Sequence, residues 1–248
     1  MKKVFQILLL VLCAMVAHAQ PDRRVQNRPY TDLRPFHFGV LLGTHFQDIE
    51  FNNVGTQHIT HEDGSTSEAL ITTDQDRWDA GLTVGVLGEF RLSTNFQFRI
   101  APAMYFGNRH LTFHNFNKQD ANGQPIEERQ DIKTAYISTA LDLIFAAPRF
   151  NNHRPYLMAG INPMVNLSGN SDQYVALKRY ETFAEVGVGC DFYLPYFKLR
   201  PELKFLFGLT NSYDAKHADG LKDKNMIPYA KSVNRSRSKM IVLTFYFE

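Results

Sequence analysis

Apolar and polar residues alternate along several stretches of the chain. In residues 197–207 every second side chain is apolar, and between them stand Lys198, Arg200, Glu202 and Lys204. The same period of two recurs in seven other stretches, which begin near residues 36, 82, 96, 137, 157, 184 and 241. A period of two is typical of a strand with one apolar and one polar face. The pattern therefore predicts eight β-strands of about ten residues each.

The connections between these strands alternate in length. Long connections cover residues 47–77, 114–130, 168–179 and 211–235, whereas short ones cover 93–95, 146–154 and 195–196. An even number of strands, with long loops at one end and tight turns at the other, is typical of outer-membrane barrels. We therefore predict an all-β fold: an eight-stranded antiparallel up-and-down transmembrane β-barrel with N- and C-termini in the periplasm.

The two faces of the strands predict what lies inside this barrel. A soluble lipocalin-like barrel or sandwich is the alternative, and it would turn the apolar face inward. Here the apolar face is uniformly Phe, Leu, Val and Ile, so we expect it to face lipid and the charged face to be enclosed. Eight strands leave a lumen that side chains fill, where charges must pair. We expect an ion-pair plug, with a conducting path or ligand site as the alternative, built from Glu89, Arg91, Arg99, Arg109, Asp142, Glu185, Asp191, Lys198, Arg200, Glu202 and Lys204.

Prolines and aromatic residues add further expectations. Pro102 and Pro201 lie within predicted strands and lack a ladder donor, so each predicts a bulge or a missing bond. Aromatic residues near strand ends predict the girdle that flanks the lipid-facing band of such barrels. They are Trp78, Tyr156, Tyr193, Tyr196 and Tyr246.

The first residues have the pattern of a secretory signal peptide. Lys2 and Lys3 precede an apolar run that ends in Ala17-His18-Ala19. We predict a signal peptide at residues 1–19, a short periplasmic segment at 20–34, a barrel domain at 35–248 and an outer-membrane location in a Gram-negative bacterium. Removal of the signal leaves equal numbers of acidic and basic residues, which excludes a global field that would attract nucleic acid. It also leaves Cys190 as the only thiol, so no intramolecular disulfide can form.

Catalytic motifs are absent from the sequence. No G-x-S-x-G occurs, and the segment from His58 to Glu62 does not have the order H-E-x-x-H of a zinc protease. His110 and His114 share a strand face, but two ligands do not make a metal site. We therefore predict no catalytic residue, no metal, no cofactor and no small-molecule substrate.

Two of the long connections carry opposite charge. Residues 47–76 contain seven acidic residues and no Lys or Arg, whereas residues 216–239 contain seven basic residues against two acidic ones. These connections become neighbours when the last strand pairs with the first. We hypothesise that they associate electrostatically over the outer mouth or that one of them binds a partner; the alternative is two solvated loops.

Four stretches together resemble the PorT family of the Bacteroidetes. They are YTDLRPFHFGVLLGTHFQDIEF at residues 30–51, RPYLMAGINPMVNL at 154–167, LRPELKFLFGLTN at 199–211 and SRSKMIVLTFYFE at 236–248. The resemblance implies a non-enzymatic outer-membrane component of the type IX secretion system. Such a component is needed for export of proteins with a C-terminal sorting domain and, in gliding bacteria, for motility. Its partners would be outer-membrane lipid and other secretion-system proteins.

Two other functions remain open from the sequence. A stand-alone structural or adhesive barrel would lack catalytic motifs in the same way. A lipid-modifying barrel enzyme would need a nucleophile and a base near the outer lipid interface.

Overall fold

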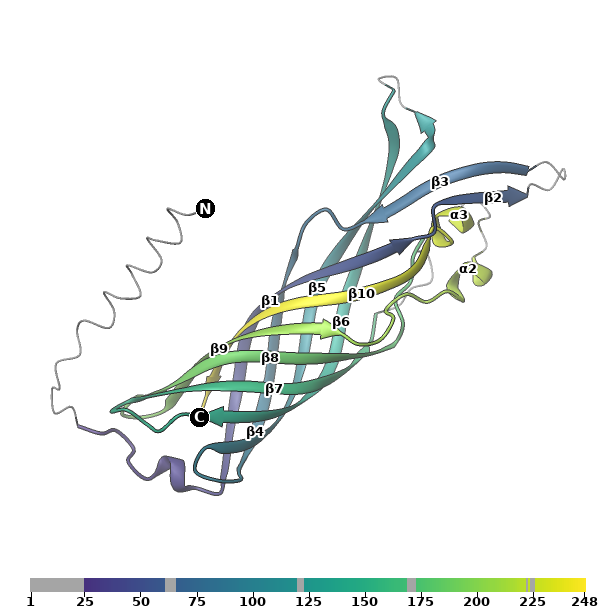
Figure 1. Ribbon diagram of the computed structural model, residues 1–248. Helices are drawn as coiled ribbons and strands as arrows, with labels where there is room; N and C mark the ends of the chain where they lie inside the picture. The colour runs from purple at the N-terminus through teal and green to yellow at the C-terminus, as the bar shows by residue number, and fades with distance from the viewer. Residues whose placement is uncertain (1–24, 61–65, 120–122, 169–172, 222, 224–225) are drawn as a thin grey trace.

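The computed structural model describes residues 25–60, 66–119, 123–168, 173–221, 223 and 226–248 (Figure 1). In these residues ten strands form one antiparallel sheet, and short helices lie at Thr31–Leu33 (η1), His217–Gly220 (α2) and Ile227–Ala230 (α3). None of the helices described is long or apolar enough to cross a membrane. The strands are β1 (Phe36–Asn53), β2 (Thr56–Thr60), β3 (Thr66–Asp74), β4 (Asp79–Arg91), β5 (Phe96–Gln119), β6 (Pro125–Ala146), β7 (His153–Asn166), β8 (Tyr180–Tyr193), β9 (Lys198–Gly208) and β10 (Val233–Phe247).

Eight of the strands close into a ring. From β4 to β10 each strand pairs with the next, and β1 pairs with both β4 and β10. The predicted eight-stranded, antiparallel, up-and-down barrel is therefore confirmed. The two remaining strands, β2 and β3, form a hairpin beside the ring, and β3 pairs with the far part of β5.

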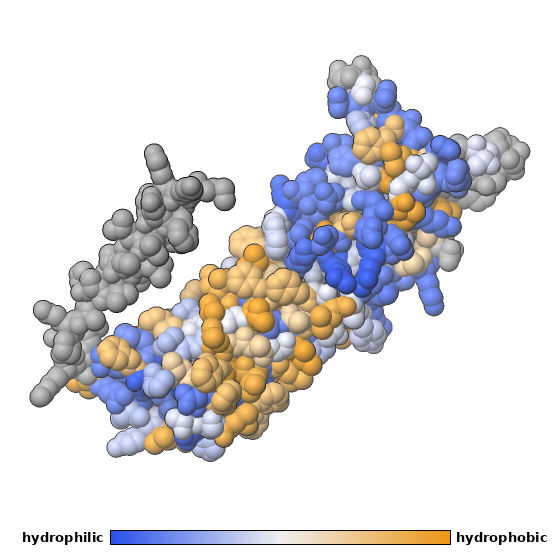
Figure 2. Space-filling view, in the orientation of Figure 1, coloured by the Kyte–Doolittle hydropathy of each residue, from blue (hydrophilic) through white to orange (hydrophobic). Residues whose placement is uncertain are grey.

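An apolar belt surrounds the middle of the barrel (Figure 2). On β1 the outward side chains are apolar and exposed from Phe36 to Phe46, with Thr44 as the exception, and they become acidic at Asp48 and Glu50. Eleven strand residues, tilted as barrel strands are, cover about 25 Å, which matches the hydrocarbon band of such barrels. The strand segments inside this belt are the membrane-spanning ones.

Several strands continue beyond the belt at the end with the long connections. β5 and β6 run for 24 and 22 residues, so much of the predicted 114–130 loop is a paired hairpin (Figure 1). The 47–77 loop likewise contains the end of β1 together with β2 and β3. The prediction of loops here was wrong because outward side chains outside lipid are polar, so the apolar alternation ends before the strand does.

The two mid-strand prolines lie at interruptions of the sheet. Pro102 is paired with Thr139 of β6, but the β4–β5 ladder breaks between Ala103 and Ile100. Pro201 is paired with Phe245 of β10, but the β8–β9 ladder breaks between Glu202 and Leu199. The missing bonds predicted at both prolines are confirmed.

An apolar core fills the barrel where it extends beyond the belt. We call it the outer apolar cluster, and it draws residues from the first, third and fourth of the predicted long connections and from the parts of β5 and β6 that flank the second. The third connection contributes Val175 and Leu177, and the fourth contributes Tyr213 and Tyr229. The full set is Ile49, Ala69, Ile71, Leu111, Phe113, Ile132, Val175, Leu177, Tyr213, Tyr229 and Val233. These connections are therefore folded onto one another.

The acidic first connection and the basic fourth one lie side by side, as predicted, because β1 pairs with β10. Lys239 Nζ lies 2.6 Å from Glu50 Oε2, and this ammonium lowers the pKa of the Glu50 carboxyl. The other contacts between the connections include backbone bonds such as Val54 N–H to Ser232 O at 2.9 Å. Strand pairing and apolar packing therefore dominate this association. Four of the charged residues behind the hypothesis, Glu62, Asp63, Lys222 and Lys224, lie outside the described residues.

Lys239→Gln is expected to leave the stability of the barrel unchanged within error. The side chains of Lys239 and Glu50 are 39% and 65% exposed, so water and salt screen their attraction. Urea unfolding of the protein in micelles at low and physiological salt would measure the change. A loss as large as that caused by a core substitution would show that this ion pair holds the two connections together.

Candidate functional site

Ten of the eleven residues predicted for the lumen are buried inside the barrel, and nine of these ten lie together. The nine occupy the half next to the short turns, and their exposed fractions are 0–3%. We call them, together with Glu248, the lumen network. Five strands and the residue that follows β10 contribute to it: Glu89, Arg99, Asp142, Glu185, Asp191, Lys198, Arg200, Glu202, Lys204 and Glu248.

Arg200 is the centre of the half of the network nearest the short turns. Its Nε lies 2.5 Å from Asp191 Oδ1, and its Nη1 lies 2.5 Å from Glu89 Oε2 and 2.7 Å from Glu248 Oε1. Lys198 Nζ forms a further ion pair with Glu248. One guanidinium thus joins β4, β8, β9 and residue 248 in a single charge-assisted cluster.

Arg99 is the centre of the other half. Its Nη1 donates to both carboxylate oxygens of Glu202, at 2.8 and 3.0 Å, and its Nε lies 3.5 Å from Glu89. Because Glu89 contacts both arginines, the two halves form one network. Lys204 extends it, lying 4.0 Å from Glu202 and 3.5 Å from Glu185.

Neutral side chains donate further hydrogen bonds to the carboxylates of the network. Tyr156 and Tyr246 donate to Glu202 at 2.6 and 2.9 Å, and Asn162 Nδ2 donates to Glu185 at 3.0 Å. The ring of Tyr246 also lies 4.4 Å from the Arg99 guanidinium, and cations over aromatic faces are attracted to them. Most of the buried charges are thus closely paired or hydrogen-bonded, as a low-dielectric interior requires. Asp142 is the exception, because its ion pair with Arg99 Nη1 is 3.8 Å long and neither of its oxygens has a hydrogen-bond partner among the described residues.

Two predicted members lie outside this network. Arg91 is half-buried at the end of β4, where it donates to Leu33 O at 3.3 Å, so its assignment to the lumen network was wrong. The strand ends at this residue, and its long side chain reaches past the rim. Arg109 is buried, but it donates to the uncharged side chains of Gln47 and Ser238 in a separate cluster nearer the long connections.

Sequence reasoning missed Glu248 and misassigned three tyrosines. Tyr156, Tyr193 and Tyr246 are buried, so their assignment to the aromatic girdle was wrong; Trp78 and Tyr196 are exposed. Proximity to a strand end suggested the girdle, but the period of two places Tyr246 and Glu248 on the inward face with Thr244. The same alternation would have identified all four residues.

A segment of residues 25–34 lies against the short-turn end of the barrel. Asn27 donates from its backbone N–H to Asn152 Oδ1 at 2.9 Å, and Arg28 Nη1 donates to Glu248 O at 3.0 Å. Asp32 accepts a hydrogen bond from Tyr193 Oη at 2.5 Å. This part of the chain therefore contacts the mouth beside the lumen network. The predicted signal peptide at 1–19 lies outside the described residues.

Comparison with protein families finds a match to the family described as outer membrane protein beta-barrel domain, over residues 18–214. The chain belongs to this family. Membership indicates an outer-membrane location for the apolar belt.

Solved structures with a similar arrangement include OprG from Pseudomonas aeruginosa. It is 12% identical, with a TM-score of 0.44 over 85% of this chain and 93% of the OprG chain. Neisserial surface protein A (NspA) is also 12% identical, with a TM-score of 0.39 over 86% of this chain and 98% of its own. No curated protein sequence matches the chain.

The lumen network fills the interior of this outer-membrane barrel with charged side chains that are 0–3% exposed. Most of its carboxylates contact cations or hydroxyls, and no three His, Cys, Asp or Glu side chains among the described residues are placed to hold a metal ion. The histidines that the sequence singled out lie apart: His110 Nδ1 is 2.7 Å from Asp79, and His58 is 3.8 Å from Glu68. His61 and Glu62 lie outside the described residues.

Gly189→Ala is expected to destabilise the barrel by about 1–3 kcal/mol, the usual cost of overpacking. A Cβ at this position would lie 2.3 Å from Cζ of Tyr156, and that ring is held by its bond to Glu202. Gly88→Ala is the control, because its Cβ would meet only the exposed ring of Phe36 at 3.3 Å. Urea titration followed by fluorescence of the single tryptophan, Trp78, would compare the two; equal losses would show that space beside Tyr156 is not limiting.

Proposed function

We propose that this protein is a non-enzymatic, closed outer-membrane barrel that serves as a component of the type IX secretion system, needed for export of proteins with a C-terminal sorting domain. The observation that supports it best is the lumen filled by paired charges. A barrel occupied in this way suits support or assembly of a machine better than passage of its cargo.

The link to secretion comes from the PorT resemblance of the four barrel stretches. The geometry supports the non-catalytic part of the proposal, because Glu89, Asp191 and Glu202 each lie within 2.8 Å of a guanidinium nitrogen and are enclosed by the barrel. The ordered extension of β1, β5, β6 and β10 beyond the belt supports a role in contacting other proteins, since it presents a folded surface rather than solvated loops.

The purified protein in planar bilayers is expected to show no ion conductance. Ions would have to cross the segment where Arg99, Glu202 and Arg200 fill the interior, and these side chains are 0–1% exposed. A stable, voltage-independent conductance of the wild-type protein would contradict the closed lumen on which the proposal depends.

The secretion role is tested by deleting the gene and complementing the deletion with the wild-type gene. We expect proteins with a C-terminal sorting domain to disappear from the culture medium and to accumulate in the periplasm, and complementation to reverse both changes. Other outer-membrane barrels and the lipid A profile are measured in the same strains and are expected to stay unchanged. Export that persists without the gene would refute the secretion role and favour a stand-alone structural barrel.

A further inference from the structure

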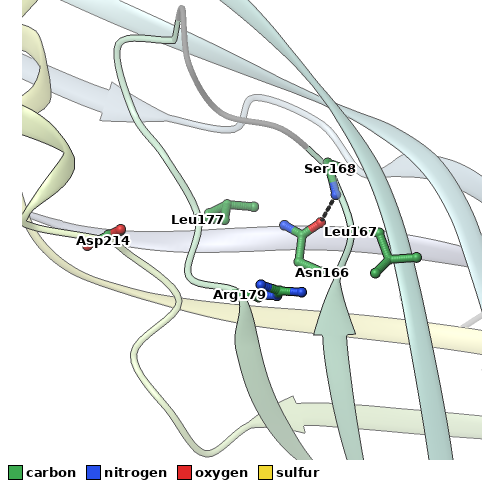
Figure 3. A pocket seen from close by; sticks show the side chains of 6 residues that line it. All are labelled: Asn166, Leu167, Ser168, Leu177, Arg179 and Asp214. Atoms are coloured by element: carbon green, nitrogen blue, oxygen red, sulfur yellow. Dashed lines mark hydrogen bonds between the residues drawn. The ribbon is translucent and has the colours of Figure 1, made fainter. Parts of the chain in front are cut away.

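A polar pocket of about 410 Å³ lies apart from the lumen network, where the third and fourth long connections meet (Figure 3). Its walls are Asn166 and Leu167 at the end of β7, Ser168, Leu177 and Arg179 before β8, and Asp214 after β9. This volume falls within the range of small-molecule sites, about 300–1,000 Å³. The pocket belongs to neither the lumen network nor the short-turn mouth.

Backbone hydrogen bonds hold the walls of the pocket in place. Asn166 N–H donates to Arg179 O at 2.7 Å, and Lys178 N–H donates to Ser212 O at 2.8 Å. Asp214 N–H donates to Ala176 O at 3.0 Å. The end of β7, residues 176–179 and residues 212–214 are therefore hydrogen-bonded to one another, so the side chains that they carry are preorganised around the pocket.

Three polar groups around this space keep hydrogen-bonding capacity. Asn166 is 95% buried and accepts from Ser168 N–H at 2.9 Å, which fixes its amide, but its Nδ2 donor has no hydrogen-bond partner among the described residues. Figure 3 shows this nitrogen turned toward Leu177 and away from Leu167. Arg179 forms no ion pair within the described part of the chain, and its guanidinium lies 5.9 Å from the ring centroid of Tyr180. Within the same part of the chain, the carboxylate of Asp214 accepts one hydrogen bond, from Lys216 N–H at 3.1 Å.

The pocket lies at the edge of the apolar belt. Leu167 and Tyr180 are exposed on the outer face directly beside it, and Val165, Thr182 and the lipid-facing side chains continue from them. Among the described residues nearest to the pocket in sequence, the exposed cations Lys178, Arg179 and Lys216 accompany the carboxylate of Asp214. A group held here would meet positive charge at the level of membrane headgroups.

The hydrogen-bond donors and acceptors of the pocket favour some classes of ligand over others. Arginine forms bidentate bonds to phosphate and carboxylate, so Arg179 suits an anion. Asp214 is an acceptor only and needs a ligand that also carries hydroxyl or amine donors. A bare phosphate or a fatty acid lacks these donors, whereas a sugar that carries an acidic group has both.

We propose that this pocket binds an acidic saccharide, the headgroup of a glycolipid whose acyl chains lie on the adjoining apolar belt. Arg179 holds the anionic group, Asp214 accepts from ring hydroxyls, and Asn166 Nδ2 donates to a ring or hydroxyl oxygen. The inference does not depend on the proposed secretion role.

The test uses the full chain in nanodiscs and isothermal titration with three probes: phosphorylated lipopolysaccharide, the oligosaccharide released from it by deacylation, and phosphatidylglycerol. Arg179→Gln removes the anion contact at an exposed position. Asn166→Asp keeps the acceptor for Ser168 N–H but removes the donor. Arg129→Gln is the matched control, because it removes one exposed charge from β6 away from the pocket.

We expect lipopolysaccharide to bind the wild-type protein, and Arg179→Gln and Asn166→Asp each to weaken this binding about tenfold or more, the effect of a lost hydrogen bond to a charged or buried partner. Arg129→Gln is expected to bind as the wild type does.

The deacylated oligosaccharide should bind more weakly than the lipopolysaccharide, and its binding should be weakened by the same two variants. If it bound as tightly as the lipopolysaccharide, the glycolipid assignment would be overturned. An equal response of all three variants, equal binding of phosphatidylglycerol, or no binding of either saccharide probe would overturn the site. Retained heat-modifiable migration of each variant on gels verifies that the barrel is folded.

Discussion

Replacement of Arg200 by methionine is expected to destabilise the barrel by about 3–5 kcal/mol, the usual cost of breaking a buried ion pair from one side. Methionine has a similar length but cannot donate hydrogen bonds. Asp191, Glu89 and Glu248 would then share one part of the lumen without the guanidinium that lies 2.5–2.7 Å from each of them. Lys198 remains beside Glu248 and Arg99 remains 3.5 Å from Glu89, so the deficit is largest at Asp191.

Arg91→Met is the matched control for this experiment. It removes the same group from a strand that also contributes Glu89, but Arg91 is half-buried at the rim and bonds only to a backbone oxygen. Urea unfolding and refolding in lipid vesicles, read by Trp78 fluorescence and by heat-modifiable migration, would give both free energies. If Arg200→Met and Arg91→Met lost the same amount, the lumen network would not be a source of stability.

The face that each residue presents could be read from the sequence to a large extent. Alternation with a period of two is a local property, and it placed Arg99, Glu202 and Lys204 in the lumen without any knowledge of neighbouring strands. Where a second, weaker rule was preferred, the prediction failed: Tyr156 and Tyr246 were assigned by their nearness to strand ends although their alternation pointed inward. The alternation of the strand determines which face a side chain occupies, and it was a stronger constraint than nearness to a strand end.

The partners within the lumen could not be predicted in the same way. Arg99 and Glu202 are 103 residues apart and lie on strands that are not neighbours in the sheet. Their meeting depends on the stagger of the closed barrel, which places side chains from several strands at one height. Alternation states only that both residues point inward, so the pairing had to come from the structure.

The outer apolar cluster shows a different limit. Val175 and Leu177 belong to a short apolar run, residues 174–177, that has neither a strand nor a helix period, so no pattern marks which of its side chains are buried. They are buried because residues from the first and fourth connections and from β5 and β6 converge on them above the belt. Such a core has no signature in any one segment, so the sequence predicted long connections but left open whether they are ordered.

Replacement of Phe113 by alanine is therefore expected to loosen the extension while leaving the membrane-spanning barrel intact. Phe113 is fully buried, with ring centroids 5.4 Å from Tyr174 and 5.7 Å from Tyr229, so its removal opens a cavity at the contact between the hairpin and two connections. A loss of about 3–5 kcal/mol is usual for a buried phenylalanine. Because the ladder of the belt does not depend on this contact, we expect the loss to appear as local opening.

Limited proteolysis of the protein in vesicles would detect that opening. Trypsin is expected to cleave Phe113→Ala at least tenfold faster than the wild type at basic residues of the third and fourth connections, such as Lys178 and Lys231. The cleavage rate rises because the variant lowers the free energy of local opening and so increases the population of the open form. Phe116→Ala is the control, since Phe116 lies on the same strand but is 46% exposed and should have little effect. Unchanged cleavage of Phe113→Ala, with a lower midpoint for unfolding of the whole barrel, would show instead that the extension and the membrane-spanning barrel unfold as one cooperative unit.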